Sequence, residues 1–123
     1  MSSRSNNTNA NVAAALFPYR KLDLSTTGQV IKATPGVIFA YYISNHNATA
    51  SVYVKFYDKA TTPTQFDTPI WTLEIPAGSA ANLDSTSGIR FAAGISVRAS
   101  TGVGDTDNTA PTSGDVTFNA GYR

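Results

Sequence analysis

The sequence has no cysteine and a single histidine, and these two scarcities exclude several kinds of chemistry. Without cysteine the chain has no thiolate for zinc binding or nucleophilic attack, and it cannot form the disulfide framework of small secreted domains. His46 lies between two asparagines in a predicted turn and has no second histidine beside which to bind a metal. We therefore predict no metal site and no cofactor.

The residue patterns of common enzymes are also missing. No serine lies in a Gly-x-Ser-x-Gly turn, and His46 would be the only base available to activate a nucleophile. Glu74 is the only acid inside a predicted strand, and it lies on the polar side of that strand. Because the paired carboxylates of a glycosidase need one buried acid, we expect a protein that is not an enzyme.

Charge is scarce as well, at 14% of residues against about 25% in an average soluble protein. The net charge is +1 and the basic residues are scattered, so no basic stripe predicts nucleic-acid binding. The longest nearly apolar run, 37–43, is far shorter than the roughly 20 residues of a membrane-spanning helix. The first residues have no signal-peptide pattern, so we expect synthesis in the cytoplasm and no membrane partner.

Short apolar or alternating segments, separated by Gly, Pro and Asn, make up most of the chain. The longest, 37–44, is apolar on both sides; we expect it to be a central strand, buried on both faces and paired with 52–57 in a hairpin. No helix longer than two turns is expected. The pattern indicates an antiparallel two-sheet β-sandwich with Greek-key or jelly-roll connections. The expected strands are 22–25, 29–33, 37–44, 52–57, 70–75, 80–83, 88–92, 94–100 and 116–121.

Residues 1–20 differ from the rest of the chain. Eight of the first eleven residues are Ser, Asn or Thr, and an apolar stretch from Val12 to Phe17 follows them. We expect an extended arm over 1–20 that lies on a neighbouring subunit, and a β-sandwich domain over 21–123. The predicted contact residues of this arm are Val12, Leu16, Phe17 and Tyr19.

Four tyrosines gather on the strands predicted over 37–44 and 52–57: Tyr41, Tyr42, Tyr53 and Tyr57. Strand alternation turns about half of them away from the core, and Tyr42 and Tyr57 are our candidates for outward contacts. An outward tyrosine suits core packing against another layer, a subunit interface or carbohydrate binding, and the sequence leaves all three open.

The segment Asp105–Thr109 is superficially similar to a calcium loop. An EF-hand numbered from Asp105 would need glycine at its sixth position and glutamate at its twelfth, where this chain has Ala110 and Val116. An Asx-rich turn is the favoured interpretation, and a calcium site of another type stays open.

Five segments share a pattern of strands and turns: Lys32–Gly36 with the apolar strand and Ser44-Asn45 after it, Val54–Ala60, Pro69–Gly78, Gly88–Phe91 and Thr101–Asp107. In their order and spacing these segments resemble small single-domain proteins from the virions of tailed bacteriophages. The resemblance covers roughly residues 28–120, and its motifs are those of strands and turns rather than of a catalytic site.

This resemblance implies a β-sandwich that acts as a virion component. The expectation is a head decoration (cement) protein, a trimer on the outside of a capsid that locks major capsid subunits together. Its partners would be the major capsid protein and copies of itself, with no nucleic acid, and its place the virion after synthesis in the host cytoplasm. Alternatives are a tail, neck or fibre component, and a carbohydrate-binding module for host attachment that uses exposed tyrosines.

Overall fold

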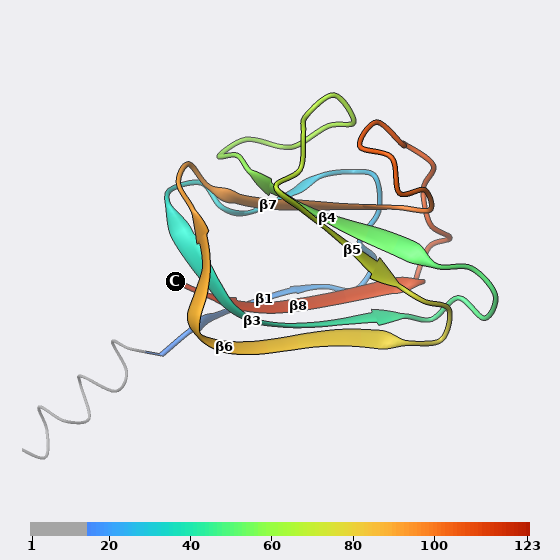
Figure 1. Ribbon diagram of the computed structural model, residues 1–123, viewed down its shortest axis with the longest axis horizontal. Coiled ribbons are helices and arrows are strands. Elements are labelled where there is room, and N and C mark those ends of the chain that lie inside the picture. Colours follow the sequence, from blue (N-terminus) through green and yellow to red (C-terminus); the bar gives the residue numbers. More distant parts are fainter. Residues whose placement is uncertain (1–14) are drawn as a thin grey trace, which may run out of the picture.

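The computed structural model describes residues 15–123, so the predicted contact residue Val12 lies outside the described residues (Figure 1). Within that range the protein is all-β, as predicted. No helix in residues 15–123 has the length and hydropathy needed to span a bilayer. The strands are β1 (Phe17–Lys21), β2 (Gln29–Lys32), β3 (Gly36–Asn45), β4 (Val52–Asp58), β5 (Trp71–Ile75), β6 (Ala80–Phe91), β7 (Ile95–Ser100) and β8 (Val116–Tyr122).

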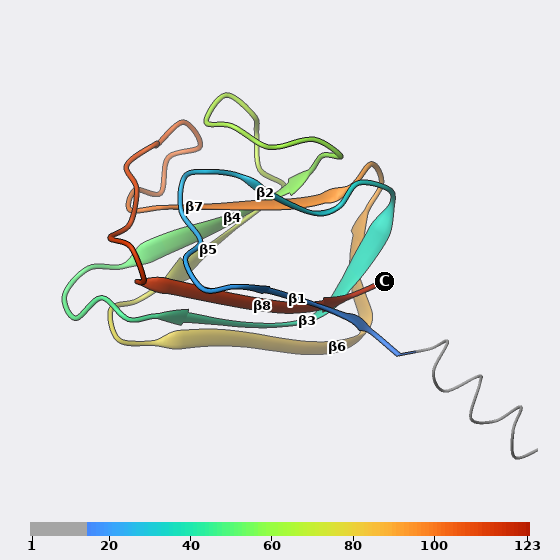
Figure 2. The same ribbon diagram turned by 180° about the vertical axis from the view of Figure 1, so that it is seen from behind.

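The strands form two four-stranded antiparallel sheets packed face to face, which confirms the predicted sandwich. One sheet has the order β1-β8-β3-β6 and the other β2-β7-β4-β5 (Figures 1 and 2). The first strand pairs with the last, the second with the seventh, the third with the sixth and the fourth with the fifth. This nested pairing, folded over on itself, is the jelly-roll arrangement.

The hydrophobic core lies between the two sheets and contains side chains from both. Phe56 of β4 is at its centre, with its ring 5.8 Å from Trp71 and about 6 Å from Tyr41 and Phe118. Buried and outward positions alternate along β8 from Val116 to Ala120 and along β3 from Tyr41 to Asn45, and the register shift between Ile38 and Ala40 keeps Ile38 on the inner side as well. The core therefore occupies one face of each sheet and leaves both outer faces for other uses.

The predicted hairpin between 37–44 and 52–57 is wrong. These segments are β3 and β4, and they lie in opposite sheets. The link between them crosses the sandwich, and the buried Asn45 holds the crossing because its amide donates to the carbonyl oxygens of Ala50 and Ile75, each at 2.9 Å. For the same reason β3 is not buried on both faces: Tyr42 on its outer side is exposed.

The sandwich also begins earlier than predicted. Phe17–Lys21 is strand β1, paired with β8 along its whole length, so the arm cannot extend to residue 20 and the expected strand over 22–25 is absent. Pro18 is tolerated because β1 is an edge strand. The side of β1 that carries Tyr19 packs inward, with the Tyr19 ring 6.0 Å from Phe118.

The segments 80–83 and 88–92, expected as two strands, form one long strand, β6. The register with β3 shifts between Ile38 and Ala40, opposite the middle of β6. Gly88 supplies the irregular backbone there with a φ of 76°, and its N–H donates to Ser85 Oγ at 3.0 Å. The glycine bends the strand rather than ending it.

Candidate functional site

The outer faces of the two sheets differ. Over the β2-β7-β4-β5 sheet lie the long loops 59–70 and 101–115, which form one side of the molecule in both views (Figures 1 and 2). We call this the covered face. The outer side of the β1-β8-β3-β6 sheet carries no loop from residues 15–123, and we call it the open face.

The covered face is built around a buried arginine. Arg98 of β7 donates from Nη1 to the Tyr57 hydroxyl at 3.0 Å, from Nη2 to Asn108 Oδ1 at 2.7 Å and from Nε to the Thr26 carbonyl at 3.0 Å. Its side chain is fully buried. One guanidinium therefore fixes strand β4, the β1–β2 connection and the β7–β8 loop to one another.

A second buried cation lies directly across from Arg98. Lys55 of β4 is its register partner, and Lys55 Nζ donates to Ser100 Oγ at 2.9 Å and to the Gly104 carbonyl. Loss of water around Lys55 lowers its pKa, the Arg98 charge lowers it further, and two aspartates of the β7–β8 loop act in the opposite direction. The direct hydrogen-bond partners that residues 15–123 give these two cations are all neutral, so the network holds loops in place rather than forming ion pairs.

The segment Asp105–Thr109 forms an Asx-type turn within this covering loop. Asp107 Oδ1 accepts the backbone N–H of Thr109 at 3.0 Å and that of Gly102 at 3.3 Å. In the described part of the chain, no group of three or more His, Cys, Asp or Glu side chains is placed to hold a metal ion. His46 is an exposed turn residue whose ring nitrogen lies 3.1 Å from Thr117 Oγ1.

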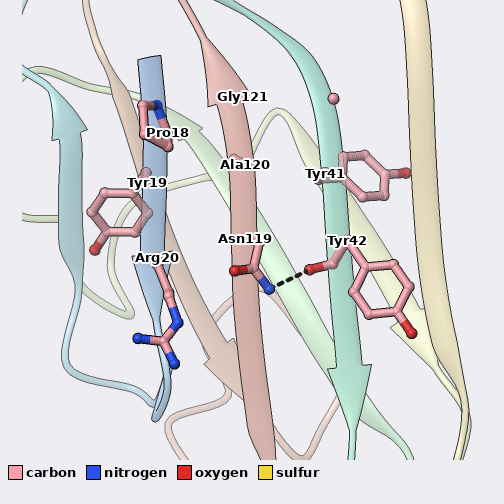
Figure 3. Close-up of a pocket in the computed structure, with 9 residues that line it drawn as sticks. Pro18, Tyr19, Arg20, Tyr41, Tyr42, Asn119, Ala120 and Gly121 are labelled. Carbon is pink, nitrogen blue, oxygen red and sulfur yellow. Dashed lines mark hydrogen bonds between the residues drawn. The ribbon is translucent and has the colours of Figure 1, made fainter. Parts of the chain in front are cut away.

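The open face presents two cross-strand rows of side chains. The middle positions of both rows have small, apolar or amide side chains. Each row has one charged residue at its end, and these two residues lie at opposite edges of the sheet. A shallow groove of about 340 Å³ runs between the rows over β1, β8 and β3 (Figure 3). From β1 to β6, the rows are Pro18-Gly121-Ala40-Asp84 and Arg20-Asn119-Tyr42-Asn82.

Leu16 lies on this open face. A side chain at Gly121 would begin 2.9 Å from Leu16 Cδ1 and 3.7 Å from Ala40 Cβ, so the missing side chain of Gly121 leaves the space that Leu16 fills. Tyr42 is on the same face and 52% exposed, and Asn119 donates to its carbonyl oxygen at 3.3 Å (Figure 3). The chain thus enters the sandwich at the start of edge strand β1, with Leu16 lying over Gly121 of β8 on the open face.

The structure separates the predicted contact residues. Leu16 and Tyr42 share the open face, whereas Tyr19 is half-buried toward the core. Phe17 is 62% exposed at the end of β1, with its ring 5.8 Å from Tyr122. Tyr57 is wrong as an interface residue: it points away from the core, but the covering loops leave it 1% exposed.

Sequence reasoning missed the small and amide residues in the middle of the open face. Gly121 and Ala40 are too small to suggest a contact by themselves, and Asn119 has no distinctive neighbours along the chain. They form a surface only because β8 lies between β1 and β3. No local pattern carries that information.

No model of a known protein family, no curated protein and no solved structure matches this chain. Its two outer faces are therefore the features from which a function can be argued. The open face combines exposed apolar surface with the point at which residues 1–14 join the sandwich.

Proposed function

We propose that the protein is a non-enzymatic structural component of a bacteriophage virion, and that it decorates the head by binding the major capsid protein. The observation that carries the proposal is the open face, on which Leu16 lies against Gly121 and Tyr42 is exposed. Eight-stranded jelly rolls are a common architecture of viral capsid domains. The resemblance of residues 28–120 to small virion proteins favours the same function.

The composition of the open face suits a flat protein partner. The solvent side of an antiparallel sheet is normally polar, yet the row through Pro18, Gly121 and Ala40 is apolar up to its edge. Exposed tyrosine, as at position 42, is enriched in protein interfaces. Burial of this surface would stabilise a complex by about 25 cal/mol for each Å² of apolar area removed from water.

Charged residues at the edges of the open face would fix the orientation of the bound partner. Arg20 lies on β1 at one edge and Asp84 on β6 at the other, and both side chains are exposed. Charges at the rim of an interface contribute more to orientation and association rate than to affinity. A capsid surface with the opposite arrangement of charges would bind this face in one orientation.

The arm is the second part of the proposed binding surface. Residues 1–14 join the sandwich next to Leu16, and their last three residues, Val12-Ala13-Ala14, are apolar. We expect Val12 and Leu16 to contact the same capsid subunit as Tyr42. Because β1 begins at Phe17, the arm can be removed without cutting into a sheet if the deletion stops at residue 14.

The test is addition of the purified full-length protein to complete phage particles that lack it, followed by electron microscopy. We expect the wild type to bind at symmetric positions on the head, and Tyr42→Glu and the 1–14 deletion each to weaken binding at least about tenfold, which is about 1.4 kcal/mol. Val103→Glu is the matched control, because Val103 is 62% exposed in the loop over the covered face. Density on the tail or neck instead would support the alternative location.

Absence of the protein from purified particles, or full incorporation of Tyr42→Glu, would contradict the proposal. The carbohydrate-binding alternative cannot use the two predicted tyrosines together, because Tyr57 is buried behind the covering loops. Tyr42 alone remains on the surface, on the side of the molecule proposed to face the capsid.

A further inference from the structure

A second concave region lies on the opposite side of the molecule, among the loops of the covered face. Its volume is about 360 Å³, and it is bounded by the β1–β2 connection, the β4–β5 loop and the β7–β8 loop. The two longer loops stand side by side in both views (Figures 1 and 2). We call this the loop pocket; its lining includes Thr26, Thr62, Thr64, Gln65, Phe66 and Asn108.

Phe66 is the most exposed large apolar side chain of the described residues, at 82%. The loop that carries it is held in shape: the Asp67 carboxylate accepts hydrogen bonds from Lys59 Nζ and from the Thr64 backbone N–H, both at 2.8 Å. The Phe66 N–H in turn donates to Thr64 Oγ1 at 3.3 Å. A loop held by hydrogen bonds thus presents the Phe66 ring to solvent, outside the hydrophobic core.

Hydrogen bonds from Arg98 also hold the polar side of the loop pocket in place before any ligand binds. Arg98 donates to Asn108 Oδ1 at 2.7 Å, and within residues 15–123 the two amide N–H groups of Asn108 form no hydrogen bond, so they can donate to a ligand. The same guanidinium binds the Thr26 carbonyl, so a single buried residue positions two walls of the pocket. Gly28 allows the β4–β5 loop to touch the β1–β2 connection, since a side chain at Gly28 would overlap the Pro63 carbonyl.

The chemistry of the lining selects the ligand. None of the pocket-lining residues is ionisable, so the pocket offers no direct charge to a phosphate, a carboxylate or a metal ion. It offers threonine hydroxyls, two side-chain amides and one aromatic ring. Hydroxyls and amides pair with a ligand rich in hydroxyl groups, and an aromatic ring packs against the apolar C–H face of a sugar ring.

We propose that the loop pocket binds a neutral saccharide. The Phe66 ring packs against one face of a pyranose, while Asn108 and Gln65 exchange hydrogen bonds with its hydroxyl groups. The proposal does not rest on the capsid function. The two sites do fit together, because a copy bound to a shell through its open face would keep the loop pocket directed to solvent.

The test is a glycan array that carries neutral and acidic oligosaccharides, probed with the full chain, with affinities for the best ligand then measured by calorimetry. We expect binding to neutral glycans, and a loss of at least about tenfold in affinity, or about 1.4 kcal/mol, for Phe66→Ala and for Asn108→Ala. Val103→Ala is the matched control: it removes an exposed apolar side chain from the same β7–β8 loop outside the pocket. Circular dichroism checks that each variant is folded.

Three results would overturn the inference: no binding to any neutral glycan, binding to acidic glycans alone, or wild-type affinity in Phe66→Ala. Since Phe66 is almost fully exposed, its variant should fold even if Asn108→Ala loosens the loop held by Arg98. The capsid proposal fails separately. Phe66→Ala should bind phage heads like the wild type, and Tyr42→Glu should bind the saccharide like the wild type.

Discussion

The two outer faces of this sandwich differ in how they treat the side chains that point away from the core. The covered face hides three outward side chains, Lys55, Tyr57 and Arg98, in a polar network beneath loops of the same chain. On the open face Tyr42 is exposed and Ala40 is only half-buried. The difference teaches that the polar residues of one face maintain the structure, whereas the apolar residues of the other remain available to a partner.

The largest effect on stability should come from the covered face. Arg98→Ala leaves one buried acceptor, the Tyr57 hydroxyl, and two part-buried acceptors, on Thr26 and Asn108, without their donor. We expect the free energy of unfolding to fall by about 3 kcal/mol, because an unpaired buried polar group costs about 1–3 kcal/mol and removal of the fully buried Arg98 side chain also leaves a cavity. Urea denaturation measures the loss.

Arg20→Ala is the control for this prediction, since it removes the same side chain from the open face. Arg20 is exposed and forms none of the side-chain hydrogen bonds recorded for residues 15–123. We expect a change within about 0.5 kcal/mol. Equal effects of the two substitutions would erase the distinction between the faces.

A smaller contrast should separate two glycines. At Gly28 on the covered side a new Cβ would overlap backbone and ring atoms of Pro63, which cannot move without shifting a loop. At Gly121 on the open face the nearest atom is the end of the Leu16 side chain, which can turn away. We expect Gly28→Ala to cost about 1–3 kcal/mol and Gly121→Ala well under 1 kcal/mol in thermal unfolding.

The opposite order, with Gly121→Ala the more damaging, would mean that Leu16 is part of the core rather than a removable cover of the open face. Removal of residues 1–14 should leave the contrast unchanged. That variant keeps Leu16 and strand β1, so it separates the contribution of the arm from that of the sandwich.

The strands themselves were largely predictable from the sequence. The segments that became β2, β3, β4, β5, β7 and β8 have local alternation or apolar runs bounded by Gly, Pro and Asn. These signals act over a few residues and survive in the fold. The Asx-type turn around Asp107 was predictable for the same reason, because its hydrogen bonds join residues two to five positions apart.

What the sequence could not supply was the partner of each strand. A turn after β3 can return the chain to the same sheet or carry it to the other, and alternation is identical in both cases. Tyr42 and Tyr57 thus had equal standing as outward residues, yet long loops cover only Tyr57. Similarly, β1 has Pro18 as its second residue, which weakens the strand pattern in the sequence, and only the pairing of β1 with β8 reveals the strand.

The network of the covered face should also show in the pH dependence of stability. Desolvation, followed by the charge of Arg98, lowers the pKa of Lys55 in the folded protein below its usual 10.5. Between the lowered pKa and 10.5 the unfolded chain binds more protons, so the contribution of Lys55 to the free energy of unfolding rises with pH. We expect Lys55→Met to remove this rise.

The measurement compares the two proteins at each pH from about 8 to about 10, near the reference range of lysine. Burial raises the pKa of Tyr19 and Tyr41, so these groups act in the opposite direction at high pH; they cancel in the difference between wild type and variant. If the free energy of unfolding of the wild type does not rise relative to that of Lys55→Met as the pH increases, Lys55 is well hydrated in the folded protein.

The smallest expected effect is the sharpest comparison, because it removes the same atom from both faces. Tyr57→Phe deletes the hydroxyl that accepts from Arg98 at 3.0 Å, and we expect a loss of about 1–2 kcal/mol in urea denaturation. Tyr42→Phe deletes a hydroxyl on a 52% exposed ring, and we expect no measurable change. If Tyr42→Phe were the more destabilising of the two, the open face would owe its exposed tyrosine to folding, and its proposed role in binding a capsid would lose its main support.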